Sequence, residues 1–336
     1  MSYTERSPLE SGFAPIFEEK IQPQLAELEF ERTAAGQRSS YRTYTIAGAT
    51  ALAVVLAFVF SDGEFAFGVL LLGGFLAGCA ITYLRDGVTD RWTQKINAIV
   101  LPPVCAHLGD LHYKATDEGQ KKEMSLEPFR RLRLLPSHER AFQSHWITGT
   151  HAGLGFEVAQ LFLTEEREGA RNKEPVFRGL TIAIDLPASL PDPGRLGLLR
   201  DRGGVGNKLA EMVSFGSSRA MPKLAFPSDA AFEAVFEVYA EDPDAAGAFL
   251  TSDMRANILR LGRGEPVVGG VEERRLCLLV PRPTRFLTPG WSDKPTSEIA
   301  GMVPGLFADL AEVLVLMDLV RAGLPQQAEA EAEGPM

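Results

Sequence analysis

Two uncharged, strongly apolar runs near the N-terminus dominate the hydrophobic pattern of the chain. They cover residues 43–61 and 65–84, and only Asp62, Gly63 and Glu64 separate them. A helix rises about 1.5 Å per residue, so about 20 residues match the thickness of the hydrocarbon core of a bilayer. The pattern therefore predicts two transmembrane helices that form a tight antiparallel hairpin. A pair of buried helices in a globular domain is the alternative.

Small residues recur at four-residue spacing on both predicted spans. The first span carries Ala49, Ala53 and Ala57, and the second carries Gly74 and Gly78. Such stripes let helix backbones approach closely where lipid removes the hydrophobic drive. They predict packing of one helix against the other within the hairpin, and a dimerisation face is the alternative.

Basic residues flank the predicted hairpin on both sides, while its turn contains only acidic charges. The basic residues are Arg32, Arg38, Arg42, Arg85, Arg91 and Lys95. Short loops rich in Lys and Arg stay on the cytoplasmic side. The expected location is the inner (cytoplasmic) membrane with both termini cytoplasmic, and the lipid bilayer is then a partner.

The remaining pattern predicts an α+β domain after the hairpin. Alternating apolar positions predict strands at 155–164, 176–186, 232–239 and 275–280, and 3.6-residue periodicity predicts helices at 91–101, 254–261 and 296–320. Pro102 and Pro103 should end the first of these helices. Strands with few long crossovers favour a mainly antiparallel sheet, followed here by a long C-terminal helix.

Four segments follow from this reading. Residues 1–42 form a cytoplasmic leader with an amphipathic helix that carries Ile16, Phe17, Ile21, Leu25 and Leu28. Residues 43–84 form the hairpin, 85–325 the cytoplasmic α+β domain, and 326–336 a disordered acidic tail.

Overall charge excludes one large class of partner. The 336 residues include 34 basic and 44 acidic side chains, which gives a net charge of -10. Nucleic acid is therefore not an expected partner, because phosphate binding needs a basic surface. Cys79, Cys105 and Cys277 are too few and too scattered for a disulfide framework or a zinc cluster.

The histidines are the most unusual feature of the predicted α+β domain. All five lie between Val104 and Ala152. His138, His145 and His151 are candidate metal ligands, because imidazole nitrogens bind zinc. No pair has the spacing of a helical His-Glu-x-x-His motif. Ordinary surface or partly buried histidines are the alternative reading, and the sequence implies no cofactor.

Two further clusters have compositions that occur in phosphate-binding or lipid-binding sites. Residues 203–208 are rich in glycine and end in Lys208, but the phosphate-loop spacing and its hydroxyl residue are missing, so a turn is the better interpretation. Arg130, Arg131 and Arg133 form a basic cluster, read either as a contact for lipid head groups or as a solvated face.

Several blocks together resemble a known family. They are the leader with Pro23 and Leu28, the hairpin, the segment Val176-Phe177-Arg178-Gly179-Leu180, and residues 232–239 with the helical block 245–261. This order is similar to that of the bacterial membrane-protein family catalogued as domain of unknown function 3137. The resemblance implies a bacterial membrane location and a cytoplasmic α+β domain, and it brings no catalytic residues.

The leading functional hypothesis is a membrane-anchored cytoplasmic binding or scaffold module. Its partner would be an unidentified protein or small molecule, and no catalytic residue is expected. The alternative is a membrane-associated, metal-dependent enzyme that uses the region from His138 to His151. A homo-oligomeric scaffold with Gly74 and Gly78 at its contact is a third reading.

Overall fold

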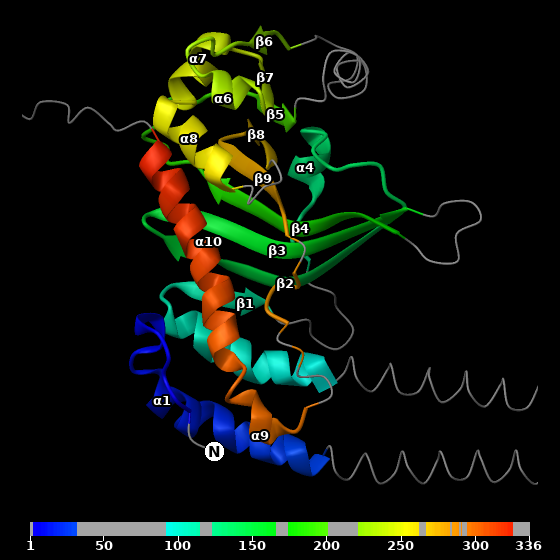
Figure 1. Ribbon diagram of the computed structural model, residues 1–336, viewed down its shortest axis with the longest axis vertical. Coiled ribbons are helices and arrows are strands. Elements are labelled where there is room, and N and C mark those ends of the chain that lie inside the picture. The colour runs from blue at the N-terminus through cyan, green and yellow to red at the C-terminus, as the bar shows by residue number, and fades with distance from the viewer. Residues whose placement is uncertain are drawn as a thin grey trace, which may run out of the picture. The chain divides into compact units, whose positions relative to one another are not determined.

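The computed structural model describes residues 3–31, 92–114, 123–165, 174–200, 221–261, 267–282, 284–288, 290 and 294–324 (Figure 1). The chain divides into two compact units. A helical unit comprises Met1–Val104 with Thr288–Leu306, and a sheet unit comprises Cys105–Leu287 with Phe307–Met336.

The helical unit contains the predicted leader helix. A short 3-10 turn, η1 (Pro8–Glu10), precedes α1 (Phe13–Ile16), which continues through a π turn, η2 (Phe17–Ile21), into a helix over residues 22–31. In the π turn, the amide of Gln22 donates to the carbonyl of Phe17. Pro23 follows directly and has no amide hydrogen to donate. The proline therefore sits at a change of helical register and does not end the helix.

Burial along the leader follows the predicted stripe. Phe17, Ile21, Leu25 and Leu28 are all buried, whereas Ile16 is only partly so. The same unit buries apolar residues of the helix at 92–107, of α9 (Thr296–Ile299) and of the first turn of α10 (Val303–Gly323): Trp92, Ile96, Val100, Leu101, Val104, Ile299, Val303 and Leu306. Apolar burial of this kind is what stabilises short helices.

The described residues of the sheet unit form nine strands in the order β1-β2-β3-β4-β9-β8-β5-β7-β6. Every neighbouring pair is antiparallel. The strands are β1 (Leu111–Lys114), β2 (Arg140–His151), β3 (Leu154–Glu165), β4 (Glu174–Asp185), β5 (Leu196–Arg200), β6 (Lys223–Leu224), β7 (Phe236–Ala240), β8 (Val268–Glu272) and β9 (Arg275–Pro281). The β8–β9 hairpin thus lies between β4 and β5, which are consecutive in the sequence.

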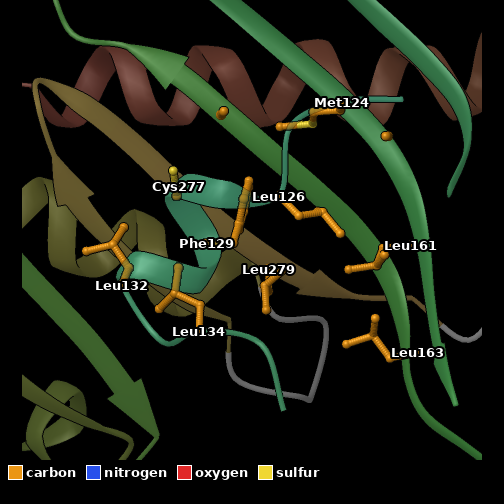
Figure 2. Packing of buried hydrophobic residues seen from close by; sticks show 11 residues of the cluster. Met124, Leu126, Phe129, Leu132, Leu134, Leu161, Leu163, Cys277 and Leu279 are labelled. Atoms are coloured by element: carbon orange, nitrogen blue, oxygen red, sulfur yellow. The ribbon is translucent and has the colours of Figure 1, made fainter. Parts of the chain in front are cut away.

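Odd-numbered residues of β3, β4 and β9 face a short helical segment at residues 123–135, which contains α4 (Glu127–Arg131). Figure 2 shows the apolar side chains of this segment over β3 and β9. The buried cluster consists of Met124, Leu126, Phe129, Leu132, Leu134, Ala159, Leu161, Leu163, Ala183, Cys277 and Leu279. Alternation along each strand sends the intervening side chains to the other face.

That other face is covered by α10 and by shorter helices. They are α6 (Ala230–Glu233), α7 (Pro243–Phe249), α8 (Ser252–Leu261) and the part of α10 from Phe307 onwards. Phe236 of β7 packs on Phe232 of α6, with ring centroids 5.0 Å apart. His151 of β2 contacts Asp318 of α10 at 2.8 Å. We call this side of the sheet the α10 face and the opposite side the α4 face.

Arg282 joins the end of β9 to α10 within the sheet unit. Its guanidinium contacts Asp309 Oδ1 and Glu312 Oε2, each at 2.6 Å. Asp309 also accepts from the amide of Leu287 at 2.7 Å. The guanidinium lies 5.5 Å from the ring centroid of Phe286. Arg282 is only 9% exposed, so its two carboxylate partners compensate a nearly buried charge.

The predicted transmembrane hairpin is not supported. In the part of the chain that the structure describes, no helix is both long enough and apolar enough to cross a membrane. Both predicted spans, 43–61 and 65–84, lie outside the described residues, as do Ala49, Ala53, Ala57, Gly74 and Gly78. The prediction rested on length and absence of charge, which a span requires but which do not by themselves establish one. The fold class and the inner-membrane location are corrected accordingly.

The antiparallel sheet and a long C-terminal helix are present, but several boundaries differ from prediction. The helix at 92–107 passes through Pro102 and Pro103, because Leu101, Val104 and Cys105 are completely buried. The predicted strand at 232–239 begins only at Phe236, because Asp229 caps helix α6 by accepting from the amide of Phe232. The predicted helix at 296–320 is divided into α9 and α10.

Candidate functional site

The structure does not bring the three candidate metal ligands together. His138 Nδ1 contacts the carbonyl of Pro136 at 2.8 Å, and His151 Nε2 contacts Asp318. His145 lies beside Tyr113, with ring centroids 6.3 Å apart. Among the described residues, no group of three or more His, Cys, Asp or Glu side chains could hold a metal ion. The metal-enzyme hypothesis therefore stays a prediction without an assembled site in this part of the chain.

His145 nevertheless occupies an unusual position. It lies in a bulge of β2, between Ser144 and Ile147, where the register against β3 shifts. Its φ of 55° is in the left-handed region, which residues with a side chain seldom adopt. Burial lowers the pKa of His145 to about 4, because desolvation disfavours the charged imidazolium. The imidazole is therefore neutral at pH 7.

A network of opposite charges surrounds the β8–β9 turn. Arg131 of α4 contacts Glu272 at 2.8 Å and Glu273 at 2.9 Å. On the α4 face, Arg275 binds Glu157 and contacts Asp185 at 3.1 Å. Glu272 and Glu273 therefore neutralise the charge of Arg131, the central member of the predicted basic cluster. Hydrogen bonding to Glu272 raises the pKa of Arg131, so the network stabilises a charge that is already paired.

The turn at the centre of this network has a strained backbone. Glu273 and Arg274 have φ values of 50° and 57°, although neither is glycine. Two such residues form the kind of tight turn whose twist suits a β-hairpin. Arg274 is held in place because its carbonyl accepts from Leu186 and its guanidinium donates to Leu190, both at 2.9 Å. The network therefore has a structural role in fixing the hairpin.

Glu237 is a second charged group with a structural environment. It is only 5% exposed on β7. It binds the ammonium group of Lys223 and accepts from the hydroxyl of Tyr239 at 3.0 Å. A carboxylate in such a setting is stabilised by a charge partner and a hydrogen bond. The contacts join β6 to β7 at the end of the sheet.

A different kind of surface lies at one edge of the sheet, where β2 and β4 begin and β3 ends. It includes residues 140–142, 162 and 176–178. Phe142, Phe162 and Arg178 are directly opposite one another across the three strands, so all three lie on the α10 face. Phe142 is 48% exposed and Val176 is 38% exposed. The guanidinium of Arg178 lies 4.9 Å from the ring centroid of Phe162. We call the set Arg140, Phe142, Phe162, Val176 and Arg178 the strand-end patch.

The patch gathers apolar side chains that are usually covered. Among the described residues the large exposed hydrophobics are Leu9, Phe30, Phe142, Val176 and Val315. Single exposed apolar residues are ordinary, but two of these five lie on β2 and β4, on either side of β3 at the end that carries Phe162. Sequence reasoning missed this surface because it did not predict β2. The alternation Arg140, Phe142, Ser144 was the available signal, and the bulge at His145 interrupts it.

Comparison with known proteins gives little further guidance. No family model matches the chain, and no curated protein matches it. The resemblance to domain of unknown function 3137 therefore stays a prediction. Among solved structures, the crystal structure of the mycobacterial trehalose monomycolate transport factor A, TtfA, is similar with a TM-score of 0.24 and 12% identity. The match covers 55% of this chain and 76% of that chain.

Proposed function

We propose that the chain is a binding module that docks another protein through the strand-end patch. The observation that carries the proposal is the row formed by Phe142, Phe162 and Arg178, of which Phe142 is nearly half exposed. Aromatic residues and arginine are enriched in protein interfaces and provide most of their hot spots. A rigid strand presents such residues at low entropic cost to the partner.

The exposed part of Phe142 is large enough to matter energetically. A phenylalanine side chain buries about 200 Å² when fully covered. Covering the exposed half would remove about 100 Å² from water, which is worth about 2.5 kcal/mol. That amount corresponds to roughly a 60-fold change in affinity. Val176 and the ring of Phe162 would add to it.

The proposal predicts that a specific partner depends on Phe142. The 336-residue chain, its Phe142→Ser variant and a Val315→Ser control would be used as baits in a lysate of the source organism. Val315 is a matched control because it is 55% exposed and lies on α10, away from the patch residues. We expect a partner that both the unchanged chain and Val315→Ser recover and that Phe142→Ser recovers about tenfold less.

Circular dichroism would first establish that all three baits have the same secondary structure. Recovery of the same proteins by the unchanged chain and by Phe142→Ser would overturn the proposal. So would the failure to recover any protein above the level seen with an empty resin.

A further inference from the structure

Building on the proposed function, we infer that the strand-end patch recognises an acidic segment of its partner that also carries apolar side chains. The patch carries two arginines, Arg140 and Arg178. Arg140 and Phe142 are two positions apart on β2, so both side chains lie on the α10 face, as Arg178 does. Arg140 therefore lies beside the exposed phenylalanine on β2, and Arg178 lies in the same row beyond Phe162.

The two arginines differ in their surroundings. The guanidinium of Arg178 is stacked over Phe162, which fixes its position. Arg140 is exposed, and its side chain makes no hydrogen bond or ion pair with a described residue. A carboxylate of the partner would thus gain a charge-assisted hydrogen bond at Arg140 without breaking one that Arg140 makes to a described residue.

The described acidic residue at the end of β3 does not neutralise this surface. Glu165 lies one position beyond Thr164, so its side chain points to the α4 face. Among the described side chains of these strand ends, the charges on the α10 face are therefore positive. This local charge is opposite to the net charge of -10 of the whole chain.

That contrast argues for a short, local recognition element. At long range an acidic partner is repelled by the net charge of the chain, but the Debye length is about 10 Å at 0.1 M salt, so distant charges are screened. Close contacts with Arg140 and Arg178 remain attractive. Alternating acidic and apolar residues in an extended segment would place carboxylates beside the arginines and apolar groups over Phe142.

Fluorescence anisotropy with a labelled peptide tests the inference on the 336-residue chain. The probe is a ten-residue peptide in which glutamate alternates with phenylalanine and leucine, and a second peptide has glutamine in place of each glutamate. We expect the acidic peptide to bind at least tenfold more tightly than its glutamine counterpart. Arg140→Gln and Phe142→Ser should each weaken binding about fivefold or more.

Arg285→Gln is the matched control, because Arg285 is also exposed but lies outside the patch. It should leave the affinity unchanged, and raising the salt concentration should weaken binding of the acidic peptide. Equal binding of both peptides, or no effect of Arg140→Gln, would overturn the inference. Concentration-dependent dimerisation of the chain that Phe142→Ser abolishes would overturn it as well, since a second copy would then be the occupant. Any of these results can occur while a Phe142-dependent partner is still recovered, so the proposed function is judged separately.

Discussion

Replacing Arg282 by methionine removes the only cation that the described structure places between Asp309 and Glu312. The guanidinium contacts both carboxylates at 2.6 Å and donates to Thr284 Oγ1 at 3.1 Å. Methionine preserves most of the aliphatic length of the side chain. Its main effect is therefore to leave two carboxylates close together without the guanidinium that contacts both of them.

The magnitude follows from how deeply these groups are buried. Breaking a buried ion pair by removing one partner costs about 3–5 kcal/mol. The side chains of Asp309 and Glu312 retain 20% and 34% exposure, so water screens part of the loss. We therefore expect a decrease of about 3 kcal/mol in the free energy of unfolding, which corresponds to a decrease in Tm of about 6–12 °C.

The dependence on pH has a definite sign. Burial raises the pKa of Asp309 above its ordinary value, although the Leu287 amide and Arg282 oppose this effect. Without Arg282 the pKa should rise further. The folded state then binds a proton more readily than the unfolded state, so stability decreases as pH rises through the folded pKa. The loss in free energy of unfolding caused by Arg282→Met should therefore be smaller at pH 5 than at pH 7.

Urea denaturation at both pH values would measure these differences, and hydrogen exchange would show whether the amides of α10 lose protection. Arg282→Met combined with Asp309→Asn and Glu312→Gln should recover most of the stability, because no uncompensated charge remains. Arg285→Met is the control for loss of an exposed arginine. A change within about 0.5 kcal/mol for Arg282→Met, or an equal deficit at pH 5 and pH 7, would refute the reasoning.

Two further substitutions test the sheet itself. The pKa of His145 is lowered to about 4 in the folded state, so the unfolded chain gains a proton first as the pH falls below about 6.5. The free energy of unfolding should therefore decrease by up to about 3 kcal/mol between pH 6.5 and pH 4. His145→Asn should reduce this acid sensitivity in urea titrations, and an unchanged pH profile would contradict the assignment. Gly270→Ala would place a Cβ 2.6 Å from the carbonyl oxygen of Leu196 and 3.2 Å from Leu132 Cδ2, so we expect a destabilisation of about 1–3 kcal/mol in thermal unfolding. Gly247→Ala, where an added Cβ meets nothing within 4 Å, is its control.

Hydrophobic periodicity in the sequence identifies the strands and helices whose side chains are buried at regular intervals. β3, β4 and β9 were predicted close to their observed bounds, because each alternates between two covered faces. The helix at 254–261 was also found. Thr251 caps it by accepting from the amide of Met254 at 3.1 Å. Local chemistry and alternation therefore suffice where no other feature interrupts them.

Other elements were missed for identifiable physical reasons. β2 is rich in polar residues and changes register at His145, so its 12 residues have no continuous alternation. β8 contains Gly269 and Gly270, which lack the side chains on which alternation depends. The candidate site was missed with β2, because Phe142 joins Phe162 and Arg178 only through pairing across strands. Nothing in the local sequence specifies that pairing.

The order of strands has a consequence for synthesis of the chain. β4 ends at Asp185, but its neighbour β9 begins at Arg275, which is 90 positions later. During translation, the edge of β4 that pairs with β9 therefore has no partner until the ribosome has synthesised the whole intervening segment. An unpaired strand edge invites association with other nascent chains. Newly made molecules should therefore benefit from chaperone protection during this interval, and slow codons placed before residue 275 would prolong the exposure of that edge.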